Sequence, residues 1–244
     1  MGLAVVLVEP AGPLNVGSVA RLCANFGIDD LRLVAPRCDP ADAQALRMAV
    51  HGQTVLQRAS TFTTLLEALS DCQRVVASCG RIDHGDIPLQ TPDQALPWVE
   101  EGLRGGAQVA LVFGREDRGL SNEELLLSHR AVRLHTGDHY PSLNLSHAVA
   151  IVLHDLQRSR HLPAANDPQP PQPSEAAAPP QLDACLQDAE ALLLEAGFLL
   201  PHTARARMAK IKGLLRRASV QAQELAMLRG MVRQLRWAIR CHRP

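Results

Sequence analysis

Short, nearly continuous apolar runs alternate with longer stretches of helical periodicity in the first 160 residues. The runs are rich in Val and Leu and lack regular polar alternation, which indicates strands buried on both faces of a sheet. Strands are expected at residues 3–8, 31–35, 74–78, 108–113 and 131–135. Helices are expected near residues 15–26, 40–50, 61–71, 93–101, 121–128 and 144–160. The alternation predicts an α/β domain with a parallel sheet between two layers of helices, with ligands bound in loops beyond the carboxyl ends of the strands.

A proline-rich segment divides the chain. Residues 161–181 contain seven prolines and almost no large apolar side chain, so we expect a partly extended linker there. The pattern therefore predicts an α/β domain at residues 1–160, a linker at 161–181 and a helical tail at 182–244.

The tail returns to helical periodicity. Gly197 fits a helix C-cap, and Pro201 fits the first turn of the helix that follows. In the last helix an arginine stripe follows an apolar stripe by one residue, about 100° around the helix. The apolar stripe is Leu225, Leu228, Val232, Leu235 and Ile239, and the arginine stripe is Arg229, Arg233, Arg236 and Arg240. We expect one face to dock on protein and its neighbour to meet phosphate groups.

The formal net charge of zero hides a segregation of charge along the chain. Residues 1–160 carry 14 Arg against 18 acidic residues, and residues 161–200 carry 6 acidic residues without any Lys or Arg. Residues 201–244 carry 11 Lys and Arg against Glu224 alone, a net of +10. Such a basic tail indicates an anionic partner, most commonly nucleic acid, with a solvated basic helix face as the alternative.

Composition indicates a globular protein. Apolar residues make up 46% of the 244 residues, enough for a large core without disulfides. The six cysteines form no CxxC pair and no Cys/His cluster, so we expect reduced thiols and no metal site. The first residues lack the basic start of a signal peptide, and no run approaches the roughly 18 apolar residues of a membrane span. We therefore expect a cytoplasmic protein that does not cross a membrane.

The first unusual loop is "EPAGPLNVGSVARLCANF" at residues 9–26, where the chain leaves a predicted strand and enters a predicted helix. Asn15 and Arg21 lie in this turn among small residues. The loop is neither GxGxxG nor a P-loop, so a nucleotide-binding dehydrogenase is disfavoured.

Two further loops follow predicted strands. The loop "FGREDRGLSNEEL" at residues 113–125 is glycine-rich, and its Ser121 opens a capping box. The loop "HYPSLNLSHAVA" at residues 139–150 starts a helix, which Ser142 or Asn144 could simply cap. Each loop alone is unspecific.

Taken in order, "NVGSVAR", "FGREDRGLSNEEL" and "SLNLSHAVAI" resemble the three signature motifs of the SPOUT class of RNA methyltransferases, and within it the TrmJ-type tRNA 2′-O-methyltransferases. The resemblance covers about residues 3–158, and "LLRRASVQAQELAMLRGMVRQL" in the tail is similar to the family's C-terminal helical extension. It implies a homodimer with the active site at the interface. It also implies a deep trefoil knot in the C-terminal part of the α/β domain, made by strand 108–113, loops 113–120 and 134–146, and the helix from residue 144. Periodicity alone predicts no knot, because knots are nearly absent from proteins.

The resemblance implies transfer of a methyl group from S-adenosylmethionine to a ribose 2′-oxygen of RNA. Arg21 would act on that oxygen, either accepting its proton with help from a neighbouring phosphate or only stabilising the forming alkoxide. Asn15 would fix its loop and contact Arg21 or the ribose, and Glu116 would organise Arg21 or the opposite subunit's loop. Ser142 and Asn144 would contact the hydroxyl, although helix capping is compatible with both.

The same resemblance places S-adenosylmethionine against three segments of mostly backbone groups. The residues concerned are Ser78, Cys79, Gly80, Gly114, Leu134, Pro141, Ser142 and Leu143. Many relatives have Thr-Ser-Ala at the first three positions, and Cys79 and Pro141 leave the outline of the pocket open. Methyl transfer from a sulfonium requires no metal.

The substrate implied is tRNA, with the cytidine or uridine at nucleotide 32 as the target. Another tRNA site or rRNA is the nearest alternative, because the motifs specify chemistry more firmly than substrate. A non-catalytic RNA-binding module with the same fold is the other alternative, and the presence of all five predicted catalytic residues argues against it.

Overall fold

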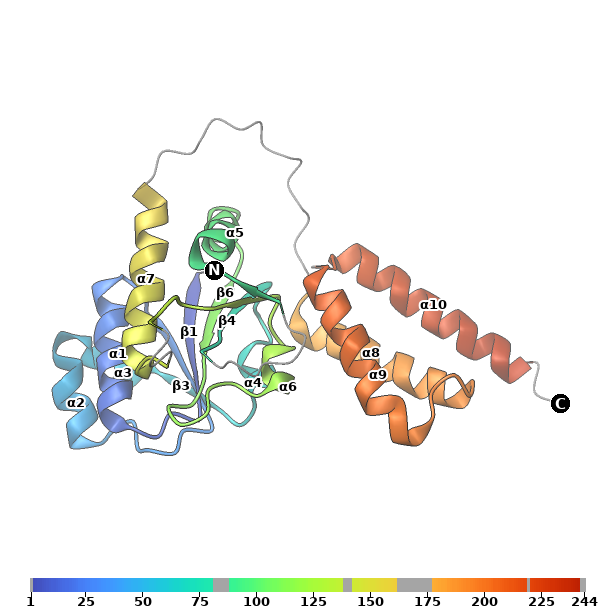
Figure 1. The fold of residues 1–244 in the computed structure, drawn as a ribbon, viewed down its shortest axis with the longest axis horizontal. Helices are drawn as coiled ribbons and strands as arrows, with labels where there is room; N and C mark the ends of the chain where they lie inside the picture. The colour runs from blue at the N-terminus through green and yellow to red at the C-terminus, as the bar shows by residue number, and fades with distance from the viewer. Residues whose placement is uncertain (1, 81–87, 138–141, 162–176, 219, 242–244) are drawn as a thin grey trace.

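The computed structural model describes residues 2–80, 88–137, 142–161, 177–218 and 220–241. At its centre lies a sheet of seven parallel strands in the order β3-β2-β1-β6-β4-β7-β5 (Figure 1). The strands are β1 (Leu3–Val8), β2 (Asp30–Val34), β3 (Ser60–Phe62), β4 (Arg74–Ser78), β5 (Leu89–Gln90), β6 (Val109–Phe113) and β7 (Arg130–Val132). The predicted parallel α/β architecture is confirmed.

Helices cover both faces of the sheet. One face packs against α1 (Pro13–Asn25), α2 (Ala43–Ala49), α3 (Gln53–Arg58), α5 (Pro92–Arg104) and α7 (Leu145–His161). The other face packs against the short helices α4 (Leu65–Ala68) and α6 (Asn122–Leu125). In β1, Val5 and Leu7 enter the first core while Ala4 and Val6 enter the second, and all four are fully buried. The nearly continuous apolarity of the strands is thus explained by burial on both faces.

All five predicted strands are present, but the helix predicted at residues 61–71 is wrong in its first part. Ser60–Phe62 forms β3, which pairs with β2, and only Leu65–Ala68 is helical. Thr and Phe favour an extended backbone at a sheet edge, and the pairing with β2 overrides the helical spacing. The strand β5 was also missed, because its two residues carry too little pattern to be recognised.

The helix predicted at 40–50 ends earlier than expected. Val50 has a left-handed φ of 49°, so α2 stops at Ala49 and a 3₁₀ turn, η1 (Val50–Gly52), leads into α3. Close packing accompanies this break: a Cβ on Gly17 would lie 2.2 Å from the Ala45 carbonyl oxygen. The helix α1 is therefore held tightly against α2, which fixes the turn that precedes it.

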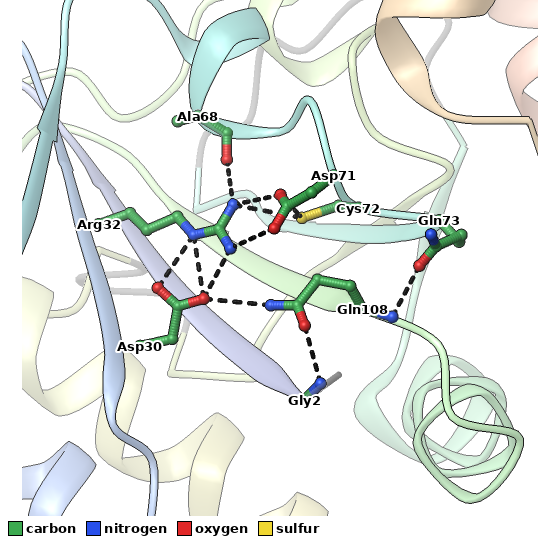
Figure 2. Close-up of polar contacts among 8 residues, drawn as sticks. All are labelled: Gly2, Asp30, Arg32, Ala68, Asp71, Cys72, Gln73 and Gln108. Carbon is green, nitrogen blue, oxygen red and sulfur yellow. Dashed lines mark hydrogen bonds and ion pairs between the residues drawn. The ribbon is translucent and has the colours of Figure 1, made fainter.

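A polar network ties together the amino ends of β1, β2 and β6 (Figure 2). Arg32 is buried, and its guanidinium donates to the carboxylates of Asp30 and Asp71. Gln108 Nε2 donates to Asp30 Oδ2 at 3.1 Å, and Gln108 Oε1 accepts from the Gly2 N–H at 2.8 Å. The two carboxylates compensate the buried charge of Arg32, so the network holds the amino ends of these strands together.

The tail folds as three helices with a core of their own. They are α8 (Pro179–Glu195), α9 (Pro201–Arg217) and α10 (Ala222–Cys241). Gly197, with φ of +75°, ends α8, and Pro201 begins α9, as predicted. The predicted linker at 161–181 lies largely outside the described residues, and its last three residues belong to α8.

The tail docks beside α4 and α6 (Figure 1). Arg216 of α9 donates through Nη1 to the Leu127 carbonyl oxygen at 2.7 Å, and Arg205 pairs with Glu123 of α6. No helix in the described part of the chain is long and apolar enough to cross a membrane.

The apolar stripe predicted on α10 is only partly buried, and the arginine stripe is only partly exposed. Leu225 is buried in the tail core, whereas Leu235 is 54% exposed. Arg236 donates to the Asp188 carbonyl oxygen of α8 at 2.7 Å, so it serves packing. Arg229, Arg233 and Arg240 are exposed.

Candidate active site

The loops after β1 and β6 meet at the carboxyl edge of the sheet. Glu9 directly follows β1 with a left-handed φ of 45°, which turns the chain away from the sheet. Its carboxylate binds the guanidinium groups of Arg115 and Arg37. The hydrogen bond from Arg115 is the main reason that the pKa of Glu9 falls to about 2, with Arg37 adding to it against the effect of burial. An ion pair thus joins the first loop to the second.

Glu116 makes a second connection between the same loops. Its Oε1 accepts hydrogen bonds from the Gly12 N–H and from Asn15 Nδ2, both at 3.0 Å, and its Oε2 accepts from the Ala11 N–H at 3.1 Å. Burial alone would raise the pKa of this carboxyl. The bonds from Asn15, Ala11 and Gly12 outweigh burial, so the pKa lies below its usual range. Glu116 is an ionised anchor for the turn into α1.

The third loop joins through Asn144. Its Nδ2 donates to Asn15 Oδ1 at 3.0 Å, while its Oδ1 accepts from the Ser146 N–H at 2.9 Å. Asn144 therefore caps α7, one of the two roles expected for it, and also binds the first loop. A continuous chain of hydrogen bonds runs from Glu116 through Asn15 to Asn144.

The second loop is held rigidly. Arg115 donates to both carboxylate oxygens of Glu124, and Ser121 and Glu124 form the predicted capping box of α6. A Cβ on Gly114 would lie 2.3 Å from the Gly119 carbonyl carbon, so only glycine fits this turn. Sequence reasoning missed Arg115, although it lies within the second motif.

A cavity of about 470 Å³ opens between these loops. Seven of the eight residues predicted to bind the cofactor line it: Ser78, Cys79, Gly80, Gly114, Leu134, Ser142 and Leu143. The eighth, Pro141, lies outside the described residues. Glu116 also lines the cavity, with Asp117 and Arg118, which were not singled out from the sequence.

The lining suits a ligand with an apolar ring and charged ends. Phe113, Leu134 and Leu145 supply apolar surface, and the volume lies in the range of small-molecule sites. Arg115 Nε is buried without a partner among the described residues and belongs to the wall of the cavity. A Cβ on Gly80 would meet no atom within 4 Å, which leaves room beside the end of β4. These features fit S-adenosylmethionine, which carries an adenine ring, a carboxylate and a sulfonium.

Arg21 is separate from this arrangement. It is exposed on α1, six residues after Asn15 and about 9 Å further along the helix axis. Its side chain makes no hydrogen bond or ion pair with another described residue, and it is not among the residues that line the cavity. Within one chain, the structure brings Asn15, Glu116 and Asn144 together and leaves Arg21 apart.

The described residues contain no group of three His, Cys, Asp or Glu side chains able to hold a metal ion. All six cysteines are free.

Known proteins are similar over nearly the whole chain. A profile described as the SpoU rRNA Methylase family matches residues 2–154, and one described as the tRNA methyltransferase TrmJ, C-terminal domain, matches residues 181–243. The tRNA (cytidine/uridine-2′-O-)-methyltransferase TrmJ of Cronobacter sakazakii is 36% identical over 233 residues, covering 93% of each chain.

Solved structures share the fold. TrmJ from Z. mobilis ZM4 superposes with a TM-score of 0.80 at 31% identity, covering 96% of this chain and 99% of that one. The SpoU methyltransferase AviRb from Streptomyces viridochromogenes, solved in complex with the cofactor AdoMet, gives a TM-score of 0.52 at 21% identity. The match covers 65% of this chain and 60% of that one, and it shows the fold alone.

Proposed function

The chain belongs to the SpoU rRNA methylase family of RNA methyltransferases, and we propose that it transfers the methyl group of S-adenosylmethionine to a ribose 2′-oxygen of tRNA. The target we infer is the cytidine or uridine at nucleotide 32 of the anticodon loop. The name of the Cronobacter relative supports the class of substrate and the two bases. The net charge of +10 in residues 201–244 supports a nucleic-acid partner.

One observation carries the proposal. The cavity lined by the predicted cofactor residues shares Glu116 with the hydrogen-bonded chain that holds Asn15 and Asn144. A site for a methyl donor and a set of polar side chains for a hydroxyl acceptor thus lie together at the carboxyl edge of the sheet, the usual place for ligands in such folds.

When bound, S-adenosylmethionine supplies a methyl group activated by a positively charged sulfur. The walls near Leu134 and Leu143 would hold its adenosine, and Arg115 would place positive charge near its carboxylate. Glu116 and Asp117 place negative charge beside the cavity and Arg115 and Arg118 place positive charge there, which suits a ligand that carries both a sulfonium and a carboxylate.

The chain's own polar residues would position the acceptor hydroxyl. Asn15 and Asn144 fix each other, and Ser142 is exposed at the mouth of the third loop. Arg21 would bind the phosphate next to the target ribose and stabilise negative charge that develops on the 2′-oxygen. A planar guanidinium can bridge both groups, which a lysine cannot do.

We also infer a homodimer in which Arg21 serves the cavity of the partner subunit. The separation of Arg21 from the cavity of its own chain supports this arrangement. Leu14 of α1 and Ile151 of α7 are 47% and 40% exposed on helices that pack together, which supports a protein contact there.

We also infer a trefoil knot in the C-terminal part of the α/β domain. β7 lies between β4 and β5, whereas α7 packs against α1, so the connection between β7 and α7 joins the β5 side of the sheet to the β1 side. This crossing supports a knot made by loop 134–146, part of which lies outside the described residues. An experimental chain trace from residue 79 to residue 145 would test it.

The decisive experiment is transfer of radiolabelled methyl from S-adenosylmethionine to unmodified tRNA, followed by mapping of the labelled nucleotide. Label on the ribose of nucleotide 32 is expected. Label at another tRNA nucleotide, or on rRNA fragments only, would keep the chemistry and change the substrate. Cofactor binding without label on either RNA would favour the non-catalytic RNA-binding module.

A further inference from the structure

A second cavity, of about 160 Å³, lies where the tail meets the α/β domain. Its walls come from the edge strand β5 and its neighbour β7, from the segment after α6, and from the last turn of α9. The cavity is separate from the methyl-transfer site: no residue lines both. No Asp or Glu is among the described residues that line it.

Arg216 is the central side chain of this cavity. It is only 1% exposed, and one of its nitrogens, Nη1, donates to the Leu127 carbonyl oxygen at 2.7 Å. Its Nε and Nη2 are buried and have no partner in the described part of the chain. Leaving two buried donors of a charged group unsatisfied is costly, so the geometry calls for an acceptor in the cavity.

The charge around Arg216 points to an anion. Arg130 and Arg217 also line the cavity. Asp183 is the acid that acts on Arg216, and it is already paired with Lys212. Burial lowers the pKa of Arg216 to about 10, as expected for a cation with too little compensating charge.

The residues behind this wall carry more positive than negative charge. The guanidinium groups of Arg74 and Arg130 both stack over the Trp98 ring, at 4.8 Å and 4.6 Å from its centroid. His129 is neutral, because burial and the three arginines around it, from α9, β4 and β7, lower its pKa to about 3. Glu101 is paired with Arg74 at 3.1 Å.

We propose that this cavity binds a phosphate group that accepts hydrogen bonds from Arg216 Nε and Nη2 and so fastens α9 to the edge of the sheet. The two donors lie side by side on a planar fork, which matches two oxygens of one phosphate. The volume is sufficient for a small polyatomic ion such as phosphate. Gln90, whose buried Oε1 has no described partner, binds a protonated phosphate oxygen or, after a half-turn of its amide, donates through its NH₂ group.

The phosphate can come from two sources. Inorganic phosphate would act as a structural ion that holds the tail against the α/β domain. A backbone phosphate of RNA would make docking of the tail part of substrate binding. The RNA source rests on the proposed function, whereas the inorganic source is independent of it.

The first test titrates inorganic phosphate into the full chain by calorimetry, at constant ionic strength with chloride as the reference. Arg216→Met keeps the length of the side chain and removes the fork. Arg207→Met, at an exposed position of the same helix, is the matched control. The wild type and Arg207→Met should bind phosphate equally, and Arg216→Met about tenfold more weakly or not at all.

The second test measures tRNA affinity over a range of salt concentrations. If a backbone phosphate fills the cavity, Arg216→Met lowers the log–log salt slope by about 1, and inorganic phosphate competes with tRNA. If inorganic phosphate fills it, Arg216→Met loses phosphate binding and keeps its tRNA affinity. Equal phosphate binding and equal tRNA binding by Arg216→Met and the wild type would overturn the proposal.

A further variant covers the case in which Arg216→Met does not fold. Arg217→Gln changes an exposed side chain at the mouth of the cavity and is expected to weaken the same binding severalfold. Unchanged phosphate and tRNA binding in that variant would then refute the site. The phosphate titration is valid whether or not the wild type methylates tRNA, so failure of the proposed function is recognised separately.

Discussion

Glu116 shows how a single carboxylate organises the candidate active site. It satisfies two backbone N–H groups and Asn15 in the turn that starts α1, and through Asn15 it reaches the third loop. Its lowered pKa keeps it ionised at neutral pH, so it serves as a fixed acceptor rather than a proton shuttle.

Replacement of Glu116 by Ala should therefore disorder the first loop and impair methyl transfer. Hydrogen bonds to a charged group contribute roughly 1.5–3 kcal/mol, so we expect kcat/KM for tRNA to fall roughly 10- to 100-fold. Glu116→Gln, which keeps one acceptor oxygen, is the size-matched control and should lose less. Wild-type kcat/KM in Glu116→Ala would show that the anchor is not required.

His129 predicts a specific dependence of stability on pH. Its pKa is about 3 in the folded protein against 6.5 for a free histidine, because burial and three arginines oppose its protonation. The unfolded chain therefore binds the proton first as the pH falls. Stability is complete above pH 6.5 and declines toward pH 3 by up to about 1.4 kcal/mol per pH unit from this residue.

Denaturant unfolding at several pH values measures this slope. His129→Gln keeps an acceptor for the Val75 N–H, which His129 Nδ1 now binds at 3.0 Å, and should flatten the slope between pH 6.5 and 3. His202→Gln, at an exposed position of α9, should leave the slope unchanged. Equal slopes in all three proteins would exclude His129 as the cause.

Among the secondary-structure elements, the sequence predicted those that are long and have a regular pattern of apolar residues. The central strands are continuous apolar runs, and the caps of α6, α8 and α9 carry recognisable residues. The edge strand β3 was not predicted, because its three residues are held extended by pairing with β2, which spacing alone does not reveal.

The candidate site was predicted from motif resemblance more than from physics. Seven of the residues predicted to bind the cofactor line one cavity, yet no periodicity indicates that the ends of β4, β6 and β7 meet there. The link that Arg115 makes between the first and second loops was missed because its partner Glu9 lies 106 residues away in sequence. The docking of α9 through Arg216 could not be predicted either. An arginine in a basic helix is expected to be exposed, whereas Arg216 is buried.

The arginine stripe of α10 gives a prediction at this scale. Replacing Arg229, Arg233 and Arg240 with Gln removes three exposed charges without touching the tail core. We expect the log–log salt slope of tRNA binding to fall by about 2–3 and cofactor affinity to stay unchanged. Arg236→Gln is the contrasting variant, because Arg236 packs on α8 and should affect stability more than the slope. An unaltered salt slope in the triple variant would remove the stripe from RNA binding.

The whole molecule separates its tasks by position. The amino edge of the sheet carries the Arg32 network, the carboxyl edge holds the cavity and its loops, and the side with α4 and α6 receives the tail (Figure 1). Arg21 is exposed and makes no hydrogen bond or ion pair with another described residue of its chain. A polar residue matching the first motif but left out of its own site is best explained by a second copy of the chain.

This explanation leads to a complementation prediction. Arg21→Ala should keep its cavity and bind the cofactor but lose turnover. Gly80→Phe should keep Arg21 but fill the cavity, since the space beside Gly80 is open. Each homodimer should be inactive. In a heterodimer the intact cavity of the first variant faces Arg21 of the second, so one of the two sites is complete.

Random exchange of equal amounts makes half the dimers mixed, so the mixture should regain about a quarter of wild-type methyl transfer. Sedimentation equilibrium supplies the control, because the two chains must first be shown to form dimers and to exchange. If Arg21 acted in its own chain, neither site of a heterodimer would be complete and the mixture would stay inactive. Recovery of activity therefore requires both a dimer and a site shared between its two chains. If the chains exchange and the mixture stays inactive, Arg21 acts on the cavity of its own chain.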